Sequence, residues 1–306
     1  MSEFQLNTPV AFIIFNRPDT TERVFAEIAK AKPPKLLVVG DGPRASRVGE
    51  ADRVAATRAI IDRVDWVCEV LTNFSEINLG CKRRVSSGID WVFDQVEEAI
   101  ILEDDCLPHP TFFRFCEELL GRYRHDQRIS QINGINFQFG HRINNDSYYF
   151  SNNCHIWGWA SWRDRWQNNY DVDMKSWPQI RDEGRLADWV CSQAEQDYWG
   201  RIFEQGYQGK VDTWDYQWDF ACRLNGQVAV LPNRNLISNI GFGQNATHTT
   251  GGSVLSNMQE EEMQFPLRHP EWVFAAKTLD RRFFNQFCET TLYQRVKAKL
   301  RQFVRS

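Results

Sequence analysis

The stretch that decides the fold is Ala-Ile-Ile-Leu-Glu-Asp-Asp-Cys-Leu-Pro, at residues 99–108. A short apolar run, as in a buried strand, ends in three successive carboxylates. In an open α/β sheet the ligand crevice lies beyond the carboxyl ends of the strands. Adjacent carboxylates repel one another, so they need cations or solvent close by. A divalent metal supplies that charge and leaves sites for substrate phosphates. A strand running into a solvated acidic turn is the alternative.

Three further apolar runs predict strands beside this one. Residues 10–15 form a continuous apolar run, and residues 36–39 and 66–71 form two shorter ones. The helical pattern between the first two includes a candidate capping box, Asp-Thr-Thr-Glu at 19–22, and ends at two prolines. Strand, helix and strand within about 30 residues make a βαβ unit. We therefore predict an α/β fold with a doubly wound, mostly parallel sheet.

The next elements follow in the same alternation. A helix that opens at Asn-Leu-Gly, residues 78–80, presents an apolar face through residue 96 and leads into the acidic strand. Apolar spacing predicts a helix over 112–123, a strand over 129–137, a helix over 215–224 and a strand over 228–232.

Composition narrows the class of protein. The net charge of −4 gives no concentrated basic face for nucleic acid. Eight cysteines without Cys-x-x-Cys spacing predict reduced thiols in a reducing compartment. The sequence shows neither a secretory signal nor an apolar run near the roughly 20 residues of a spanning helix. We therefore expect a cytoplasmic protein.

The end of the chain is basic. Residues 279–306 carry seven basic side chains against two acidic ones, and Leu292, Val296, Leu300 and Phe303 lie at helical spacing. A basic amphipathic helix binds an anionic bilayer peripherally, here at the inner face of the membrane. A docked terminal helix with a solvated basic face is the alternative.

Charged side chains follow three of the predicted strands. Asn16 and Arg17 follow the first, Asp41 ends the second, and residues 103–105 end the fourth, so all should meet at one sheet edge. Residues 82–84, Lys-Arg-Arg, lie near a helix start and are candidates for a diphosphate. Each also has a plain explanation: a surface ion pair, a turn former and a solvated helix face.

Several motifs together resemble a known family. Residues 15–18 (Phe-Asn-Arg-Pro), 78–80 and 102–108 resemble the N-terminal half of GT-A type glycosyltransferases, the last being their Asp-x-Asp-type motif. Glu-Asp-Asp followed by a proline and two phenylalanines at 112–113 is similar to the N-acetylglucosaminyltransferases that start complex N-glycans. Residues 157–162, Trp-Gly-Trp-Ala-Ser-Trp, resemble a motif of bacterial surface-polysaccharide transferases.

The resemblance covers roughly residues 9–250 and implies a GT-A nucleotide-sugar transferase domain over 1–250. Within it, 140–215 would be a tryptophan-rich segment on the acceptor side. Residues 251–306 would form a C-terminal helical extension with the basic amphipathic helix.

The resemblance also implies a nucleotide-sugar site with a metal ion. Asp105 would ligate Mn²⁺ or Mg²⁺, and Asp104 would hold the ribose or a metal-bound water. His248 would be a further metal ligand; a solvated loop histidine is the alternative. Arg17 and Asp41 would contact the nucleoside of the donor, a UDP-sugar by preference. The remaining predicted binding residues are Asn16, Lys82, Arg83 and Glu103.

Members of this family place an acid at a helix start facing the acceptor. Asp215 is the predicted general base, with Thr213 as the helix cap and Asp219, one helical turn along, as the second candidate. The motif differs from the commoner family form, which has Glu-Asp here.

Nine of the 12 tryptophans lie between residues 157 and 218. Their apolar faces and N–H donors suit sugars, and Trp157, Trp159 and Trp162 are the predicted acceptor contacts. We expect at least half of the nine to be core.

The predicted function is metal-dependent, inverting transfer of a hexosyl or N-acetylhexosaminyl group from a nucleoside-diphosphate sugar to a glycan or lipid-linked acceptor. A sugar-phosphate nucleotidyltransferase of the same fold is one alternative, although its usual glycine-rich loop is absent after the first strand. A carbohydrate-binding or scaffold protein without catalytic activity is the other.

Overall fold

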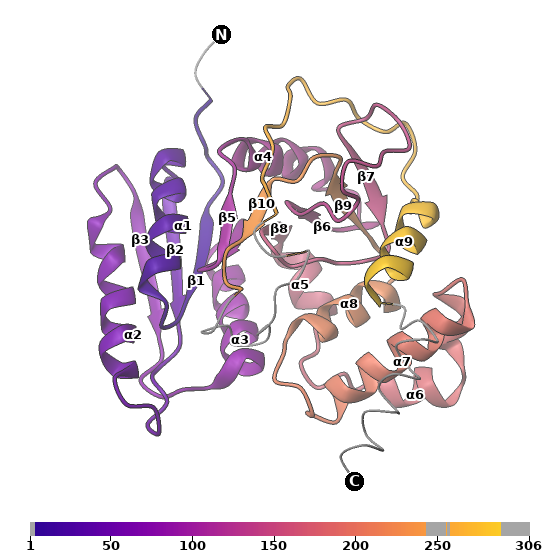
Figure 1. Ribbon diagram of the computed structural model, residues 1–306, viewed down its shortest axis with the longest axis horizontal. Coiled ribbons are helices and arrows are strands. Elements are labelled where there is room, and N and C mark those ends of the chain that lie inside the picture. The colour runs from indigo at the N-terminus through magenta and orange to yellow at the C-terminus, as the bar shows by residue number, and fades with distance from the viewer. Residues whose placement is uncertain (1–3, 243–254, 256–257, 289–306) are drawn as a thin grey trace, which may run out of the picture.

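A large mixed sheet forms the middle of the molecule. The computed structural model describes residues 4–242, 255 and 258–288. In this part of the chain, an eight-stranded sheet has the order β3-β2-β1-β4-β8-β6-β9-β7, and β10 pairs with β5 beside it (Figure 1). The strands are β1 (Val10–Ile14), β2 (Lys35–Gly40), β3 (Glu69–Phe74), β4 (Glu98–Glu103), β5 (Cys106–Pro108), β6 (Ile129–Asn133), β7 (Tyr148–Ser151), β8 (Trp159–Trp162), β9 (Val228–Pro232) and β10 (Ile237–Asn239).

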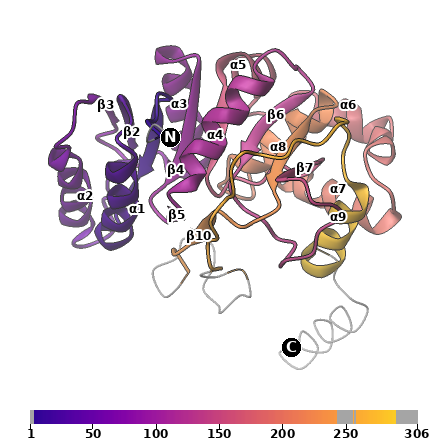
Figure 2. The ribbon, with the colours of Figure 1, turned by 90° about the horizontal axis from the view of Figure 1, so that it is seen from above.

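Helices cover both faces of this sheet (Figure 2). Alternate residues of β1 face opposite ways: Phe12 packs with α1 and α4, whereas Ala11 packs with α3 and α8. The helices are α1 (Pro18–Ala31), α2 (Glu50–Ala59), α3 (Gly80–Gln95), α4 (Thr111–Tyr123), α5 (Arg163–Asn169), α6 (Trp177–Asp182), α7 (Gln193–Tyr207), α8 (Asp215–Leu224) and α9 (Lys277–Phe283), with the short turns η1 (Ile60–Arg63), η2 (Arg185–Asp188) and η3 (Phe284–Cys288).

The first four strands of the sheet, β3-β2-β1-β4, are parallel, as the sequence predicts. Ile14 is opposite Gly40 of β2, and Ile13 is opposite Glu103 of β4. The carboxyl ends of these strands are therefore level with one another. The residues that follow them meet at one edge of the sheet.

The second half of the sheet is mixed. β8 is antiparallel to both β4 and β6, and β7 is antiparallel to β9, while β6 and β9 are parallel. Both β7 and β8 come from residues 140–215. Part of the segment expected on the acceptor side is therefore built into the central sheet.

The predicted capping box is wrong, and one predicted strand is shifted along the chain. α1 begins at Pro18 and has no side-chain cap, because proline at the first helical position supplies the required φ without one. The strand expected at 66–71 is β3, at Glu69–Phe74. Trp66 instead packs against Phe25 of α1 and donates from Nε1 to the Pro33 carbonyl at 2.9 Å.

The later helix and strand predictions are confirmed at α8 and β9. Among the described residues, no helix combines the length and the apolar character needed to cross a bilayer. Most of the basic amphipathic segment, from residue 289 on, lies outside the described residues.

Candidate functional site

The acidic motif contacts the end of β1 through Arg17. The guanidinium Nη1 lies 3.0 Å from Asp105 Oδ2, and Nη2 donates to Asp104. The backbone N–H of Phe15 donates to the second oxygen of Asp104 at 3.2 Å. Arg17, Asp104 and Asp105 therefore form one cluster across two strand ends. The sequence predicted their proximity, but it did not predict that they pair with one another.

The three carboxylates remain only partly neutralised by one arginine. Burial, together with Asp105 and Asp104, raises the pKa of Glu103 to about 8. Burial also raises the pKa of Asp104, and Arg17 offsets part of that rise. Glu103 Oε1 is buried, and no other described group hydrogen bonds to it. The cluster therefore has unused capacity for a cation or a hydrogen-bonding ligand.

The chain after β10 closes over this cluster. The Ile240 N–H donates to the Asp105 carbonyl at 2.8 Å. A Cβ on Gly241 would lie 2.2 Å from Asp105 Oδ2 and 2.8 Å from Arg17 Nη1, so only glycine fits there. His248 follows seven residues later and lies outside the described residues.

A metal ion at this point would need ligands beyond the described side chains. Among those residues, no group of three or more His, Cys, Asp or Glu is arranged to hold one. Mg²⁺ and Mn²⁺ are commonly held by one or two carboxylates together with substrate phosphates. Asp105, with the unpaired oxygen of Glu103 nearby, fits that kind of site.

Asp41 lies at the end of β2, as predicted, but its carboxylate is fully engaged. It is 7% exposed and accepts from the N–H groups of Gly42, Leu79 and Gly80 and from Asn78 Nδ2, at 2.9–3.2 Å. Burial raises the pKa of Asp41, while these backbone donors lower it. Asp41 thus holds the loop before α3 in place, and a nucleoside contact would have to displace one of these donors.

Asn16 lies in a second polar cluster, centred on Glu50. Asn16 Nδ2 donates to Glu50 at 2.8 Å, and the Arg44 N–H donates to it at 2.7 Å. Hydrogen bonding by Arg44 holds the pKa of Glu50 at about 2, although the carboxylate is fully buried. Sequence reasoning missed Glu50, because an acid in the first turn of a helix is common and carries no sign of burial.

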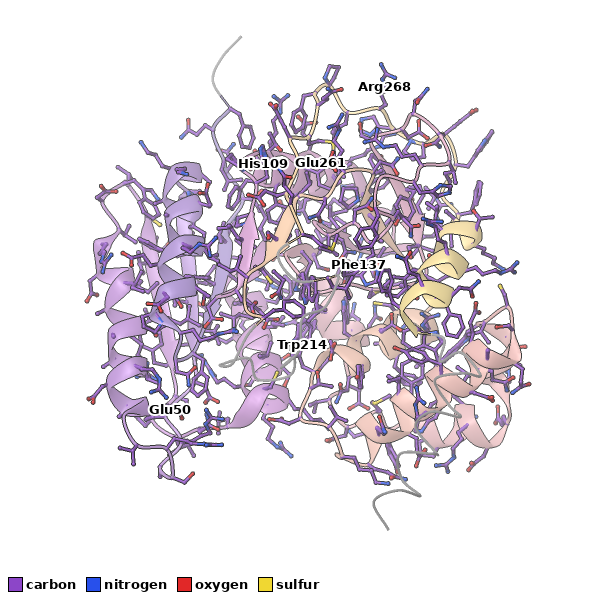
Figure 3. The ribbon with its side chains drawn as sticks, viewed as in Figure 1. Glu50, His109, Phe137, Trp214, Glu261 and Arg268 are labelled. Carbon is purple, nitrogen blue, oxygen red and sulfur yellow. The ribbon has the colours of Figure 1, made fainter. Side chains whose placement is uncertain are left out.

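The predicted base, Asp215, is the first residue of α8. Trp214 is the N-cap residue, and the Thr213 hydroxyl donates to the Asp215 carboxylate, so Thr213 is not the helix cap that we expected. Burial raises the pKa of Asp215. Its charge also contributes, as the smallest of the causes, to the raised pKa of Glu103. Figure 3 shows Trp214 near the middle of the molecule, with Glu50 at the lower left and His109 above.

Asp219 has different surroundings. It is 5% exposed, accepts from Arg223 Nε at 2.6 Å and accepts from the Cys154 N–H at 2.9 Å. Because both oxygens are engaged with the interior of the protein, the geometry favours Asp215 as the base.

The predicted cationic residues start α3. Lys82 is half-buried and Arg83 is exposed. Arg84 is buried and donates to the Asn73 carbonyl and side chain. Lys82 and Arg83 thus remain candidates for an anionic ligand, whereas Arg84 is structural.

Most of the tryptophan cluster is core, as expected. The buried members are Trp159, Trp162, Trp166, Trp177, Trp214 and Trp218. Trp159 and Trp162 are 0% and 2% exposed because β8 is an interior strand, so their predicted acceptor contacts are wrong.

Trp157 is half-buried and lies nearer the acidic motif. Its ring packs against Phe242 at 5.6 Å and Phe137 at 5.4 Å between centroids. Phe242 directly follows Gly241, which contacts Asp105. Trp157 therefore remains compatible with an acceptor contact.

Comparisons with known proteins add little. No family model matches the chain, and no curated protein matches it. A solved structure of UDP-glucose pyrophosphorylase complexed with UDP-glucose is similar at a TM-score of 0.27 and 12% identity. The match covers 48% of this chain and 62% of that one, which is less than two thirds of its length. A likeness at this level supports no functional argument, so the case for function depends on the site.

Proposed function

We propose that the chain is a metal-dependent, inverting glycosyltransferase of the GT-A type. It would move a hexosyl or N-acetylhexosaminyl group from a nucleoside-diphosphate sugar, by preference a UDP-sugar, to a hydroxyl of a glycan or lipid-linked acceptor. The observation that carries the proposal is the joining of Arg17, Asp104 and Asp105 at the ends of two parallel strands.

The donor would lie along the carboxyl ends of β1, β2 and β4. Asp105 would hold Mn²⁺ or Mg²⁺, which neutralises charge on the departing diphosphate. Lys82 and Arg83 would attract the same diphosphate, and Asn16 and Asp41 would lie on the nucleoside side. Arg17 is half-buried and already paired, so it would act mainly by orienting Asp104 and Asp105.

The acceptor would approach from the side of α8. Asp215 would take the proton of the acceptor hydroxyl as its oxygen bonds to the anomeric carbon, and the bond to the diphosphate oxygen would break. The proton would remain on the Asp215 carboxylate. Burial favours this transfer because it raises the pKa of the carboxyl group. Attack opposite the leaving group inverts the anomeric configuration.

Product analysis tests this proposal. The protein is incubated with Mn²⁺ and a panel of UDP-sugars, and released UDP is measured for wild type and for Asp105→Ala. An exposed aspartate of η1 is changed in the control, Asp62→Ala. We expect UDP release that the control retains and Asp105→Ala loses.

Two other results would replace the proposal. Pyrophosphate released from UTP and a sugar 1-phosphate, without UDP release, would show a nucleotidyltransferase. Saccharide binding without UDP release from any donor would show a binding or scaffold protein.

The proposed location is the cytoplasmic side of a membrane, through the basic C-terminal segment. Co-sedimentation with lipid vesicles tests this part separately. We expect more protein to pellet with anionic than with neutral vesicles, and less so at high salt. Equal pelleting with both vesicles would contradict it.

A further inference from the structure

The first turn of α3 is capped by two aspartates from different parts of the chain. A helix leaves its first four N–H groups without a partner inside the helix. At α3, Asp41 accepts from the Leu79 and Gly80 N–H groups. Asp212 accepts from the next two, those of Cys81 and Lys82, each at 2.9 Å. All four donors are thereby paired, and both caps come from outside the helix.

The two caps connect distant segments. Asp41 ends β2, whereas Asp212 lies in the loop between α7 and α8, 130 residues beyond Lys82. Figure 1 shows this loop beside α3. Thr213 follows Asp212 directly, Asp215 lies two residues farther on, and the Thr213 hydroxyl donates to the Asp215 carboxylate. A short path of bonds therefore runs from the end of β2 through α3 to the candidate base.

Gly80 leaves little room for change at this contact. Its φ is +78°, and a Cβ there would lie 2.7 Å from Asp212 Oδ2. Glycine is thus required twice at this position, once by the backbone conformation and once by the approach of Asp212.

We propose that Asp212 is a positioning residue, which fixes the loop bearing Asp215 to the first turn of α3 and so sets the base against the donor site. This inference rests on the proposed function for its effect on rate. The structural part of the inference, that the Asp212 carboxylate holds two segments together, does not depend on the proposed function. Lys82 donates its backbone N–H to Asp212, so its side chain remains free to serve an anionic ligand.

Hydrogen exchange tests the structural part. Amide exchange is followed by mass spectrometry in wild type, Asp212→Ala and Asp212→Asn. The matched control is Asp171→Asn, because Asp171 also accepts from two backbone N–H groups, of Asp173 and Lys175, within a single loop. For Asp212→Ala we expect faster exchange in both 80–83 and 209–216, with a smaller change for Asp212→Asn. The control should leave both segments unchanged.

Kinetics test the positioning role. Misplacing a reacting group by about 1 Å can cost about 10²-fold in rate. We expect Asp212→Ala to lower kcat for UDP release by about 10–100-fold, by a larger factor than it raises the KM for the donor, and Asp212→Asn to recover part of the loss.

Three results separate the claims. If exchange rises only in 80–83, and 209–216 and kcat stay at wild-type values, Asp212 merely caps α3 and the inference is overturned. If kcat falls no more than in the Asp171→Asn control, the positioning role is likewise overturned. If the wild type releases no UDP, the proposed function fails, and the exchange data alone decide whether the two segments are held together.

Discussion

The two aspartates of α8 should respond in opposite ways to the same substitution. Asp219 pairs with Arg223 in the interior, where the two residues are 5% and 7% exposed. Asp219→Asn keeps the size of the side chain but leaves the Arg223 guanidinium without its counter-charge. Asp215→Asn removes instead a half-buried carboxylate whose pKa burial has already raised.

The expected magnitudes differ accordingly. Removing one partner of a buried ion pair costs about 3–5 kcal/mol of unfolding free energy. Arg223 keeps Asn153 Oδ1 at 2.8 Å and the Trp199 ring at 4.1 Å, so the lower end of that range is expected. Asp215→Asn should leave stability unchanged or slightly raised at pH 7, because the ionised form is disfavoured in the folded protein. It should lower kcat for transfer about 10²–10⁴-fold.

Denaturant unfolding and UDP release, measured on both variants, distinguish a structural role for Asp219 from a catalytic role for Asp215. Asp219→Asn should unfold at lower denaturant and, where still folded, keep most of its activity. Asp215→Asn should unfold like the wild type and be nearly inactive. The reasoning is refuted if Asp219→Asn is as stable as the wild type and inactive while Asp215→Asn retains activity.

Four further variants test separate parts of the account. Gly241→Ala should abolish Mn²⁺-dependent UDP release, since the added methyl collides with Asp105; wild-type rates would contradict that packing. Burial lowers the pKa of His155 from 6.5 to about 3, so its neutral form stabilises the protein above pH 6.5 and that contribution is lost as pH falls toward 3. The free energy of unfolding should therefore fall by about 1.4 kcal/mol per pH unit in this range for the wild type, and this fall should be absent from His155→Gln. Denaturant unfolding at a series of acid pH values measures it, and equal pH dependence in the wild type and the variant would refute the prediction. Trp159→Ala should lower the free energy of unfolding by about 3–5 kcal/mol. Trp157→Ala should unfold like the wild type and raise the KM for the acceptor. The reverse pattern would show that Trp159 contacts the acceptor and that Trp157 is core.

The parallel half of the fold is predictable because its signals are local. Residues 10–14 and 99–102 are continuous apolar runs that only a buried strand accommodates, and the acids after β4 mark its carboxyl end. The apolar spacing likewise predicted that α8 begins at Asp215. In the mixed half, strands were predicted at the positions of β6 and β9, but β7 and β8 were not, because their pairing with distant strands leaves no period in the tryptophan-rich sequence.

The position of the candidate site could be predicted from the sequence, but the hydrogen-bond and ion-pair partners of its side chains could not. Topology alone brings Arg17 to the acids after β4. The partners of each side chain depend on contacts between distant residues, and these carry no sequence signal. Asp41, predicted as a nucleoside contact, also caps α3, which the sequence did not indicate. Asp212 caps the same helix from 171 residues farther along, and it was missed because it is one exposed acid among many.

The central claim is that a divalent cation and a nucleoside diphosphate bind together at residues 103–105. Calorimetric titration of UDP into the protein, with Mn²⁺ or with EDTA, tests this most directly. Binding should be measurable for the wild type with Mn²⁺, and it should be lost with EDTA and in Asp105→Ala. Equal affinity in all three samples, or no heat of binding in any of them, would contradict the account.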